Sequence, residues 1–228
     1  MLHAILTASF LVLPLVLRDE AGVASGDHWE VYLPVMFTSV LVMLPFIFLA
    51  ERSGRIKPVF LGAIIVLMCA ELGLYLMPPT LLNVIVLLII MFAAFNLLEA
   101  MLPSLVSRVA PVDCRGTAMG FYSSSQFLGA FLGGSLGGLL QGMLGLHGVF
   151  MCAALGALIW VLVAATMSSP LKLSNYIYRT GTLDPGQVSA LSRQLSALAG
   201  VAEAVVVAEE GVAYLKVDKR VFDEAALP

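Results

Sequence analysis

The most prominent feature of the sequence is a series of long apolar runs, separated by short segments rich in polar residues, glycine or proline. Most runs approach the roughly 20 apolar residues that a helix needs to cross the hydrocarbon core of a bilayer. The runs are Leu2 to Leu17, Val31 to Ala50, Pro58 to Met77, Leu81 to Leu102, Gly116 to Leu140 and Val149 to Met167. The pattern therefore predicts an all-α transmembrane bundle of six helices.

Beyond Pro170 the pattern changes to shorter apolar stretches among frequent charges, which is typical of a domain in water. A strand is expected at Asn175 to Arg179. A helix should follow, because Asp184 can cap it, Pro185 suits its first position and Gln187 stands in capping-box register. Its single apolar stripe consists of Val188, Leu191, Leu195 and Leu198.

The end of this helix and the elements after it are also indicated by the sequence. Gly200 can close the helix at its C-terminal end. Ala204 to Ala208 and Val212 to Val217 predict two strands joined by the turn Glu209-Glu210-Gly211. Asp218 is expected to cap a last short helix. The predicted order is therefore β-α-β-β-α.

The composition supports a division into two domains. Of the 228 residues, 60% are hydrophobic and only 12% are charged, and the mean hydropathy is +0.99. Soluble domains are about half apolar and a quarter charged. We therefore expect a six-helix membrane domain over residues 1–168, whose solvent is the lipid bilayer, and a small soluble α+β domain over residues 169–228.

Several function classes are excluded by the residues present. The net charge of −3 and the absence of basic clusters with aromatic residues argue against nucleic-acid binding. Cys69, Cys114 and Cys152 form no CxxC or Cys/His cluster, so we expect neither a disulfide framework nor a metal site. No nucleophile and base stand in a catalytic pattern. The sequence thus predicts no enzyme and no cofactor.

The loops indicate the orientation in the membrane, because Lys and Arg are enriched in short cytoplasmic loops. Basic residues on one side are Arg52, Arg55, Lys57, Arg108, Arg115 and Lys172. The opposite loops contain only Arg18, next to Asp19 and Glu20. Both termini are therefore predicted to be cytoplasmic.

The first apolar run allows other interpretations. A signal peptide is disfavoured, because no basic region precedes the run and Arg18 follows it with no small-residue cleavage site. The run is short for a span and begins directly after Met1, so we expect that its natural start lies upstream. The chain is then a fragment of a longer protein.

A stripe of glycines marks the fifth run. The glycines at small-xxx-small spacing are Gly129, Gly133, Gly134, Gly137, Gly138 and Gly142. Such residues let helix backbones approach closely in lipid. We expect them to support helix packing, either static or along a face that slides during a conformational change.

The loop Glu51-Arg52-Ser53-Gly54-Arg55-Ile56-Lys57 resembles a loop motif of the major facilitator superfamily. In that motif an acid at a helix end can pair with basic groups on a neighbouring helix, while a glycine permits a tight turn. The resemblance implies a cytoplasmic latch made by Glu51, Arg52, Gly54 and Arg55. An ordinary basic cytoplasmic loop is the alternative, because Ile47 replaces a glycine of the full motif.

Two longer segments resemble YajR-type transporters of this superfamily. They run from Phe95 to Leu105 and from Gly116 to Gly129, and are similar to the tenth and eleventh helices. The segment Val201 to Asp218 resembles the C-terminal cytoplasmic domain of these transporters, which is ferredoxin-like and lacks the metal-binding CxxC of heavy-metal-associated domains. The resemblance covers only the last six of twelve spans, so it implies a C-terminal half.

The resemblance places the fourth predicted helix along a central cavity. An acid inside a membrane span is costly and is a functional candidate for that reason. We expect Asn96, Glu99, Tyr122 and Gln126 to form a substrate cavity or gate, with a structural pair between Glu99 and Arg108 or Arg115 as the alternative. Glu71 lies in a helix that the resemblance places at the periphery. A structural hydrogen bond is expected for it.

The sequence thus predicts half of a secondary active transporter in the inner membrane. It would move an unidentified small molecule by alternating access, and the resemblance implies proton coupling. Its partner would be the missing N-terminal half or a second copy of the chain. The alternative is a six-span membrane protein that acts as a homodimer or as a regulatory ligand-binding module.

Overall fold

The structure is a computed structural model that describes residues 1–111, 114–167, 173–181, 184–208, 210–218 and 221–227. The chain divides into two compact units, Met1–Pro170 and Leu171–Pro228. Each unit has a hydrophobic core of its own. That one unit lies in the membrane and the other in the cytoplasm stays a prediction.

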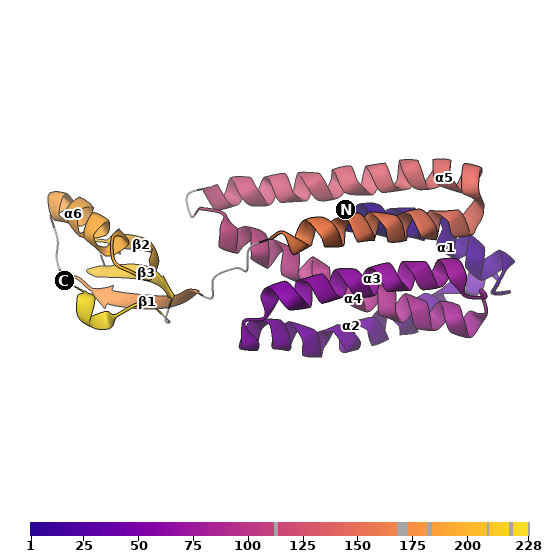
Figure 1. Cartoon of the computed structure of the whole chain (residues 1–228), viewed down its shortest axis with the longest axis horizontal. Coiled ribbons are helices and arrows are strands. Elements are labelled where there is room, and N and C mark those ends of the chain that lie inside the picture. The colour runs from indigo at the N-terminus through magenta and orange to yellow at the C-terminus, as the bar shows by residue number, and fades with distance from the viewer. Residues whose placement is uncertain (112–113, 168–172, 182–183, 209, 219–220, 228) are drawn as a thin grey trace. The chain divides into compact units, whose positions relative to one another are not determined.

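The first unit is helical (Figure 1). Five helices in the described part of the chain are long and apolar enough to cross a membrane. They are α1 (Leu2–Asp19), α2 (His28–Ser53), α3 (Ile56–Leu76), α4 (Leu81–Val109) and α5 (Arg115–Ala165), with a short 3₁₀ turn, η1 (Ser25–Asp27), before α2.

Helix α5 consists of two arms joined at Gly145. The φ of +75° and ψ of −177° at Gly145 interrupt the helix, and Figure 1 shows the chain turning back there. A straight helix of 51 residues would measure about 77 Å at 1.5 Å per residue, more than twice the thickness of the hydrocarbon core. The arms, residues 115–144 and 146–165, contain the fifth and sixth predicted spans. The expected loop between Leu140 and Val149 is replaced by one glycine.

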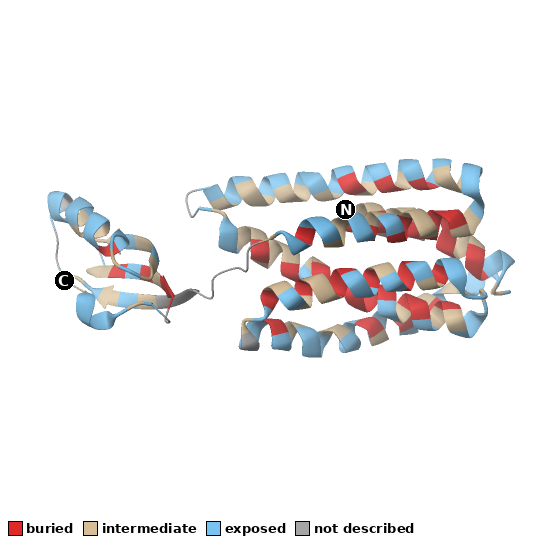
Figure 2. Cartoon of the chain, viewed as in Figure 1, coloured by how far each residue is buried: buried red, intermediate tan, exposed pale blue. Residues whose placement is uncertain are grey.

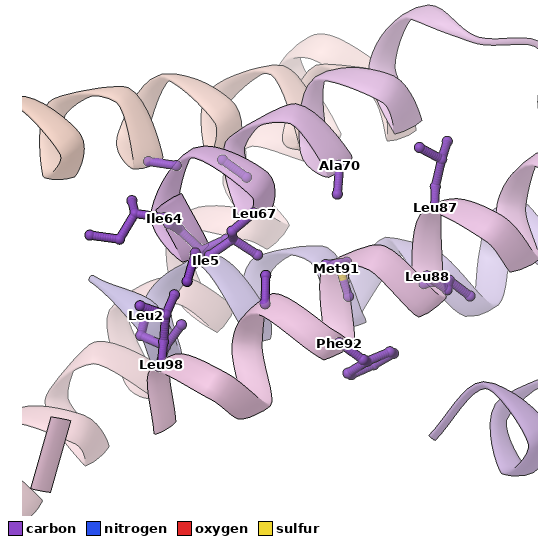
Figure 3. Packing of buried hydrophobic residues seen from close by; sticks show 14 of the residues in the cluster. Leu2, Ile5, Ile64, Leu67, Ala70, Leu87, Leu88, Met91, Phe92 and Leu98 are labelled. Atoms are coloured by element: carbon purple, nitrogen blue, oxygen red, sulfur yellow. The ribbon is translucent and has the colours of Figure 1, made fainter. Parts of the chain in front are cut away.

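The core of the first unit lies between α1, α3, α4 and the second arm of α5. α1 packs along α5, α3 packs on both α4 and α5, and α2 packs on α4. Figure 3 shows Leu2 and Ile5 of α1 close to Ile64 and Leu67 of α3, with Leu98 of α4 beside them. Buried residues follow the inner faces of these helices (Figure 2).

Two parts of the bundle are much less covered. Figure 2 shows the first arm of α5 exposed along most of its length, and Phe121 on it is 78% exposed. Helix α2 likewise carries exposed Phe37 and Phe48 on its outer side. These surfaces are apolar, so they require lipid or another protein segment as their neighbour.

The second unit contains a three-stranded antiparallel sheet and one helix. Its elements are β1 (Leu173–Arg179), α6 (Pro185–Ser196), β2 (Val201–Val207), β3 (Val212–Asp218) and the 3₁₀ turn η3 (Glu224–Ala226). The strand order is β1-β3-β2. Tyr176 of β1 and Ala204 of β2 both stand opposite Leu215 of β3. β1 and β2 are therefore parallel to each other and joined through α6, which is the split β-α-β arrangement of ferredoxin-like domains.

The predicted helix of the second unit is confirmed, including its start. The Asp184 N–H donates to Gln187 Oε1 at 2.9 Å in a capping box. Leu195 is fully buried beside Ala213, Leu215 and Val217. The predicted end was wrong, because α6 ends at Ser196 with Ala197 as its C-cap.

Two further details differ from the sequence-based expectations. Gly200 has a φ of +85° directly before β2, where a Cβ atom would lie 2.6 Å from the backbone nitrogen of Phe222. A close approach of backbone therefore explains this glycine. The expected last helix is only the 3₁₀ turn η3, which Asp223 caps through the Ala225 N–H at 3.0 Å. Asp218 is the last residue of β3, and the predicted cap falls on residues 219–220, which lie outside the described part of the chain.

Candidate functional site

Three of the four predicted cavity residues lie together in the first unit. Tyr122 and Gln126 are one turn apart on the first arm of α5 and share a face. Gln126 Nε2 donates to Glu99 Oε1 of α4 at 2.8 Å and to the Tyr122 hydroxyl oxygen at 2.9 Å. This amide thus connects α4 with α5 through a polar cluster, which we call the Glu99 cluster.

His3 of α1 is a fourth member of the Glu99 cluster that the sequence analysis missed. His3 Nε2 lies 3.8 Å from Glu99 Oε2, and its ring packs edge-on against Phe95 at 5.8 Å between centroids. Glu99 Oε2 is buried and, among the described residues, accepts no hydrogen bond. The signal available in the sequence is a histidine in the first turn of a mainly apolar helix.

A small cavity adjoins the Glu99 cluster. Its volume is about 210 Å³, and its wall includes His3, Tyr122, Ser125, Gln126 and Trp160. Pockets that enclose a drug-sized ligand measure about 300–1,000 Å³. This cavity has the polar and aromatic lining of a binding site, but its size is that of one part of such a site.

Asn96 does not belong to the Glu99 cluster. Its Nδ2 donates to the buried Ser39 Oγ of α2 at 3.2 Å, and the Ser39 hydroxyl donates to the Met36 carbonyl at 2.8 Å. Residues three apart on a helix point about 60° apart, so Asn96 meets α2 while Glu99 meets α5. The sequence analysis assigned both residues to one cavity or gate and did not resolve this difference.

The predicted latch residues lie at one end of the bundle, where Glu51 pairs with α4. Both carboxylate oxygens of Glu51 accept from Arg108 Nη2 at 2.9 Å. Arg108 was considered as a partner of Glu99, and the structure instead gives it Glu51. Gly54 ends α2 with a φ of +66°, Arg52 is exposed in the last turn of α2, and Arg55 is the N-cap of α3.

The two ends of the first unit are each held by contacts between distant helices. At the latch end, Lys57 Nζ donates to the Ala165 carbonyl at 2.9 Å, which joins the start of α3 to the end of α5. At the opposite end, His147 Nε2 lies 2.9 Å from Glu20 Oε2 and Nδ1 lies 3.1 Å from the Leu74 carbonyl oxygen. His147 therefore connects the ends of α1 and α3 next to the turn at Gly145.

The glycine stripe of α5 separates into two faces. Gly129, Gly133 and Gly137 are buried and face α1. A Cβ on Gly133 would overlap the Ala4 backbone and the Thr7 hydroxyl, and a Cβ on Gly137 would lie 3.0 Å from Ala8 Cα.

The other three glycines of the predicted stripe do not approach a helix backbone. A Cβ on Gly134 or Gly142 would meet nothing within 4 Å, and one on Gly138 would meet only Leu11 Cδ2 at 3.9 Å. Gly134 and Gly138 each lie one residue beyond the contact face and are rotated from it by about 100°, and Gly142 follows Gly138 one turn later. The close contact is reinforced by the Thr7 hydroxyl, which donates to the Ala130 carbonyl at 3.0 Å.

Glu71 has the structural hydrogen bond that the sequence analysis expected. It is fully buried on α3, and its Oε1 accepts from Ser9 Oγ of α1 at 2.8 Å. This contact links α1 to α3 inside the hydrophobic core of the first unit. It makes Glu71 a part of the helix packing, separate from the Glu99 cluster.

Comparisons with known proteins indicate the family to which the chain belongs. The family profile described as Major Facilitator Superfamily matches residues 2–194. The inner membrane transport protein YajR of Escherichia coli is 39% identical over 223 residues, which is 96% of this chain and 48% of that protein. An uncharacterized transporter of Buchnera aphidicola is 33% identical over 128 residues, 56% of this chain and 33% of that protein.

The chain spans half or less of the length of these curated relatives. The relative with the longer match aligns with both units, because 223 residues of this chain are covered. The family profile alone matches well over half of the chain. The chain belongs to the major facilitator superfamily.

Proposed function

We propose that this chain forms the C-terminal half of a secondary active transporter, which moves a small solute by alternating access. One observation carries the proposal: the alignment with YajR includes 96% of this chain but only 48% of YajR. The two arms of α5 and the four helices before it supply the six spans of one half. The solute itself is not identified.

An N-terminal six-helix half is the proposed partner. The exposed apolar face on the first arm of α5 and the outer side of α2 need a neighbour. The Glu99 cluster and its cavity of about 210 Å³ would provide one wall of a larger site shared with that half. A homodimer of this chain is the competing arrangement.

Within this proposal the polar residues have separate roles. Glu99, Tyr122 and Gln126 contact the solute, with His3 beside them. The carboxylate of Glu99 and the imidazole of His3 are also the groups available for proton coupling. Asn96 contributes through the α2 to α4 contact that it makes with Ser39.

The latch and the glycines would act on the motion of the half. The Glu51 to Arg108 pair joins α2 to α4 at one end and would break and re-form as the gate moves. Gly129, Gly133 and Gly137 hold α5 against α1, so that these helices move together.

We further propose that both termini, the latch end and the second unit are cytoplasmic. The ends of α2, α4 and α5 lie on one side, as the Glu51 to Arg108 and Lys57 to Ala165 contacts indicate. This side carries the basic residues that favour the cytoplasm. Cys114 is exposed on it, whereas Ser25 precedes α2 on the other.

Two experiments test these assignments. Differently tagged copies of this chain and of the N-terminal half of E. coli YajR are co-expressed, with a six-span half of an unrelated transporter as control. We expect a one-to-one complex only with the YajR half. A homodimer that forms regardless of the added half would contradict the proposal.

The second experiment concerns orientation. With Cys69 and Cys152 replaced by alanine, an impermeant maleimide should label Cys114 only from the cytoplasmic side. In a cysteine-free background, Ser25→Cys should be labelled only from the opposite side. Labelling of both positions from the same side would refute the proposed topology.

A further inference from the structure

The first unit contains a second, larger cavity away from the Glu99 cluster. It measures about 410 Å³ and lies between α2 and α3, with α4 behind it. α2 packs extensively on α4 but only slightly on α3, so a groove remains between α2 and α3. Its walls include Phe46 of α2, Pro58 and Gly62 of α3, and Ala94 of α4.

The lining of this groove determines what can fill it. All of its lining residues are apolar side chains, glycine or proline. Water is not held in such a cavity, because it would find no hydrogen-bonding partners. In a membrane-spanning helix bundle, an acyl chain is the apolar material that is always present at such a surface.

The dimensions of the groove fit one leaflet. On α3 it extends from Pro58 to Val66, which is about 12 Å along a helix that rises 1.5 Å per residue. One leaflet contributes about 15 Å, half of a hydrocarbon core of roughly 30 Å. The groove therefore begins next to the loop between α2 and α3, and its length along α3 is less than the thickness of one leaflet.

The loop at the open end of the groove carries excess positive charge. Arg55 is exposed at the start of α3, one turn before Pro58, and Arg52 is exposed in the last turn of α2. The acid of this loop, Glu51, is held by Arg108 of α4. Among the described residues the Arg55 guanidinium makes no ion pair, so it can bind an anionic headgroup, and a guanidinium can bind a phosphate with two parallel hydrogen bonds.

We propose that this groove binds an anionic phospholipid, with an acyl chain between α2 and α3 and the headgroup phosphate on Arg55, flanked by the charge of Arg52. The site is separate from the solute site and does not depend on transport. A helix of a partner protein in the same groove is the competing occupant. The proposal requires that the acyl chain and the headgroup both contribute to binding.

Two substitutions separate these contributions. Gly62→Leu places a side chain into the groove, and a Cβ at this position meets nothing within 4 Å, so the helices need not move. Gly142→Leu is the matched control, because it too adds a leucine at an open glycine position, on α5 outside the groove. Arg55→Gln removes the charge of the proposed headgroup site.

The full-length chain is delipidated in detergent and titrated with dioleoyl phosphatidylglycerol or dioleoyl phosphatidylcholine, and bound lipid is counted by native mass spectrometry. We expect phosphatidylglycerol to bind more tightly. Arg55→Gln should weaken phosphatidylglycerol binding roughly fivefold, toward that of phosphatidylcholine, which is the effect of one basic group near an anionic lipid. Gly62→Leu should weaken the binding of both lipids, and Gly142→Leu should weaken neither.

Three results would overturn the proposal. The first is equal binding of the two lipids, and the second is unchanged lipid binding in Gly62→Leu. The third is that Gly62→Leu keeps its lipid but no longer associates with an N-terminal half, which would assign the groove to a helix. If Gly62→Leu does not fold, Val66→Trp at the far end of the groove replaces it, with the same expected loss of both lipids.

Discussion

The two units of the chain reach a defined structure in different ways. In the first unit nearly every surface is apolar, so hydrophobicity alone does not distinguish an inner face from an outer one. In the second unit, Leu195, Ala213, Leu215 and Val217 are the buried apolar residues among those described. These few apolar residues therefore define the core of the second unit. In the bundle, apolar residues do not by themselves show which faces of the helices meet.

The bundle is specified instead by small residues and by isolated polar contacts. Gly133 allows the backbone of Ala4 to approach closely, and Ser9 of α1 donates a hydrogen bond to Glu71 of α3. Such contacts fix which faces meet, because the alternative for a polar group in lipid is to remain without a partner. Loss of one buried leucine should therefore destabilise mainly the second unit, whereas addition of a leucine at a close helix contact should destabilise mainly the first.

Removing one leucine from the second unit should have the largest effect. Leu195→Ala should cost about 2–5 kcal/mol, which is comparable to the whole of the roughly 3–5 kcal/mol that a core of this size supplies. We expect the backbone amides of β2 and β3 to lose their protection against hydrogen exchange, while those of the first unit stay protected. Val205→Ala, at a position that is 43% exposed, is the control and should preserve the protection.

Adding one leucine to the first unit should have the next largest effect. Gly133→Leu forces a side chain into Ala4 and Thr7, and overpacking of this kind costs about 1–3 kcal/mol. A Cβ at the neighbouring Gly134 would meet nothing within 4 Å, so Gly134→Leu is the matched control. Thermal unfolding in detergent should separate the two variants, and equal melting temperatures would contradict close packing of α1 on α5.

Breaking the Glu51 to Arg108 ion pair of the latch should change the stability of the protein little. It should have a larger effect on how accessible the cavity is to a labelling reagent. Exposed ion pairs contribute about 0.2–1 kcal/mol, so Glu51→Gln should melt close to the wild type. In the complex with an N-terminal half, we expect it to change the maleimide labelling rate of Ser125→Cys, a cavity residue. Asp19→Asn, which breaks the exposed pair with Arg18, should not. Identical rates in all variants would argue that the pair is only part of a basic loop.

The smallest effect is expected on the outer face of the sheet. The Tyr214 hydroxyl donates to Glu210 at 2.7 Å, and this hydrogen bond with the nearby negative charge raises the pKa of Tyr214. A raised pKa in the folded state stabilises the folded state at pH values below the unfolded pKa near 10. This stabilisation is lost as the pH rises through the pKa of the folded state. Tyr214→Phe should therefore be slightly less stable at neutral pH, and the difference should vanish in strong alkali when followed by pulse proteolysis.

The sequence predicted the elements better than their junctions. Length and apolarity located the helices, and the alternation after Pro170 located all three strands. The sequence indicated a break between Leu140 and Val149 but not that Gly145 alone makes the turn, because the helix continues on both sides of this glycine. The end of α6 was placed too late, because Gly200 looks like a helix cap in sequence but serves a backbone approach at Phe222.

The site was predicted less completely, for a related reason. Glu99, Tyr122 and Gln126 were found because acids and amides stand out in apolar helices. His3 was missed because its approach to Glu99 depends on how α1 packs against α4 and α5, which no local pattern encodes. The direction of Asn96 toward Ser39 and the pairing of Arg108 with Glu51 depend on helix rotation in the same way.

The turn at Gly145 also bears on how the protein is made. Residues 116–165 contain no Asp, Glu, Lys or Arg, and the two arms are joined without a polar loop. During biosynthesis the two arms can thus enter the bilayer together as one hairpin, because no charged loop has to be carried across. The last two spans would be a single insertion unit, which returns the chain to the side from which it entered.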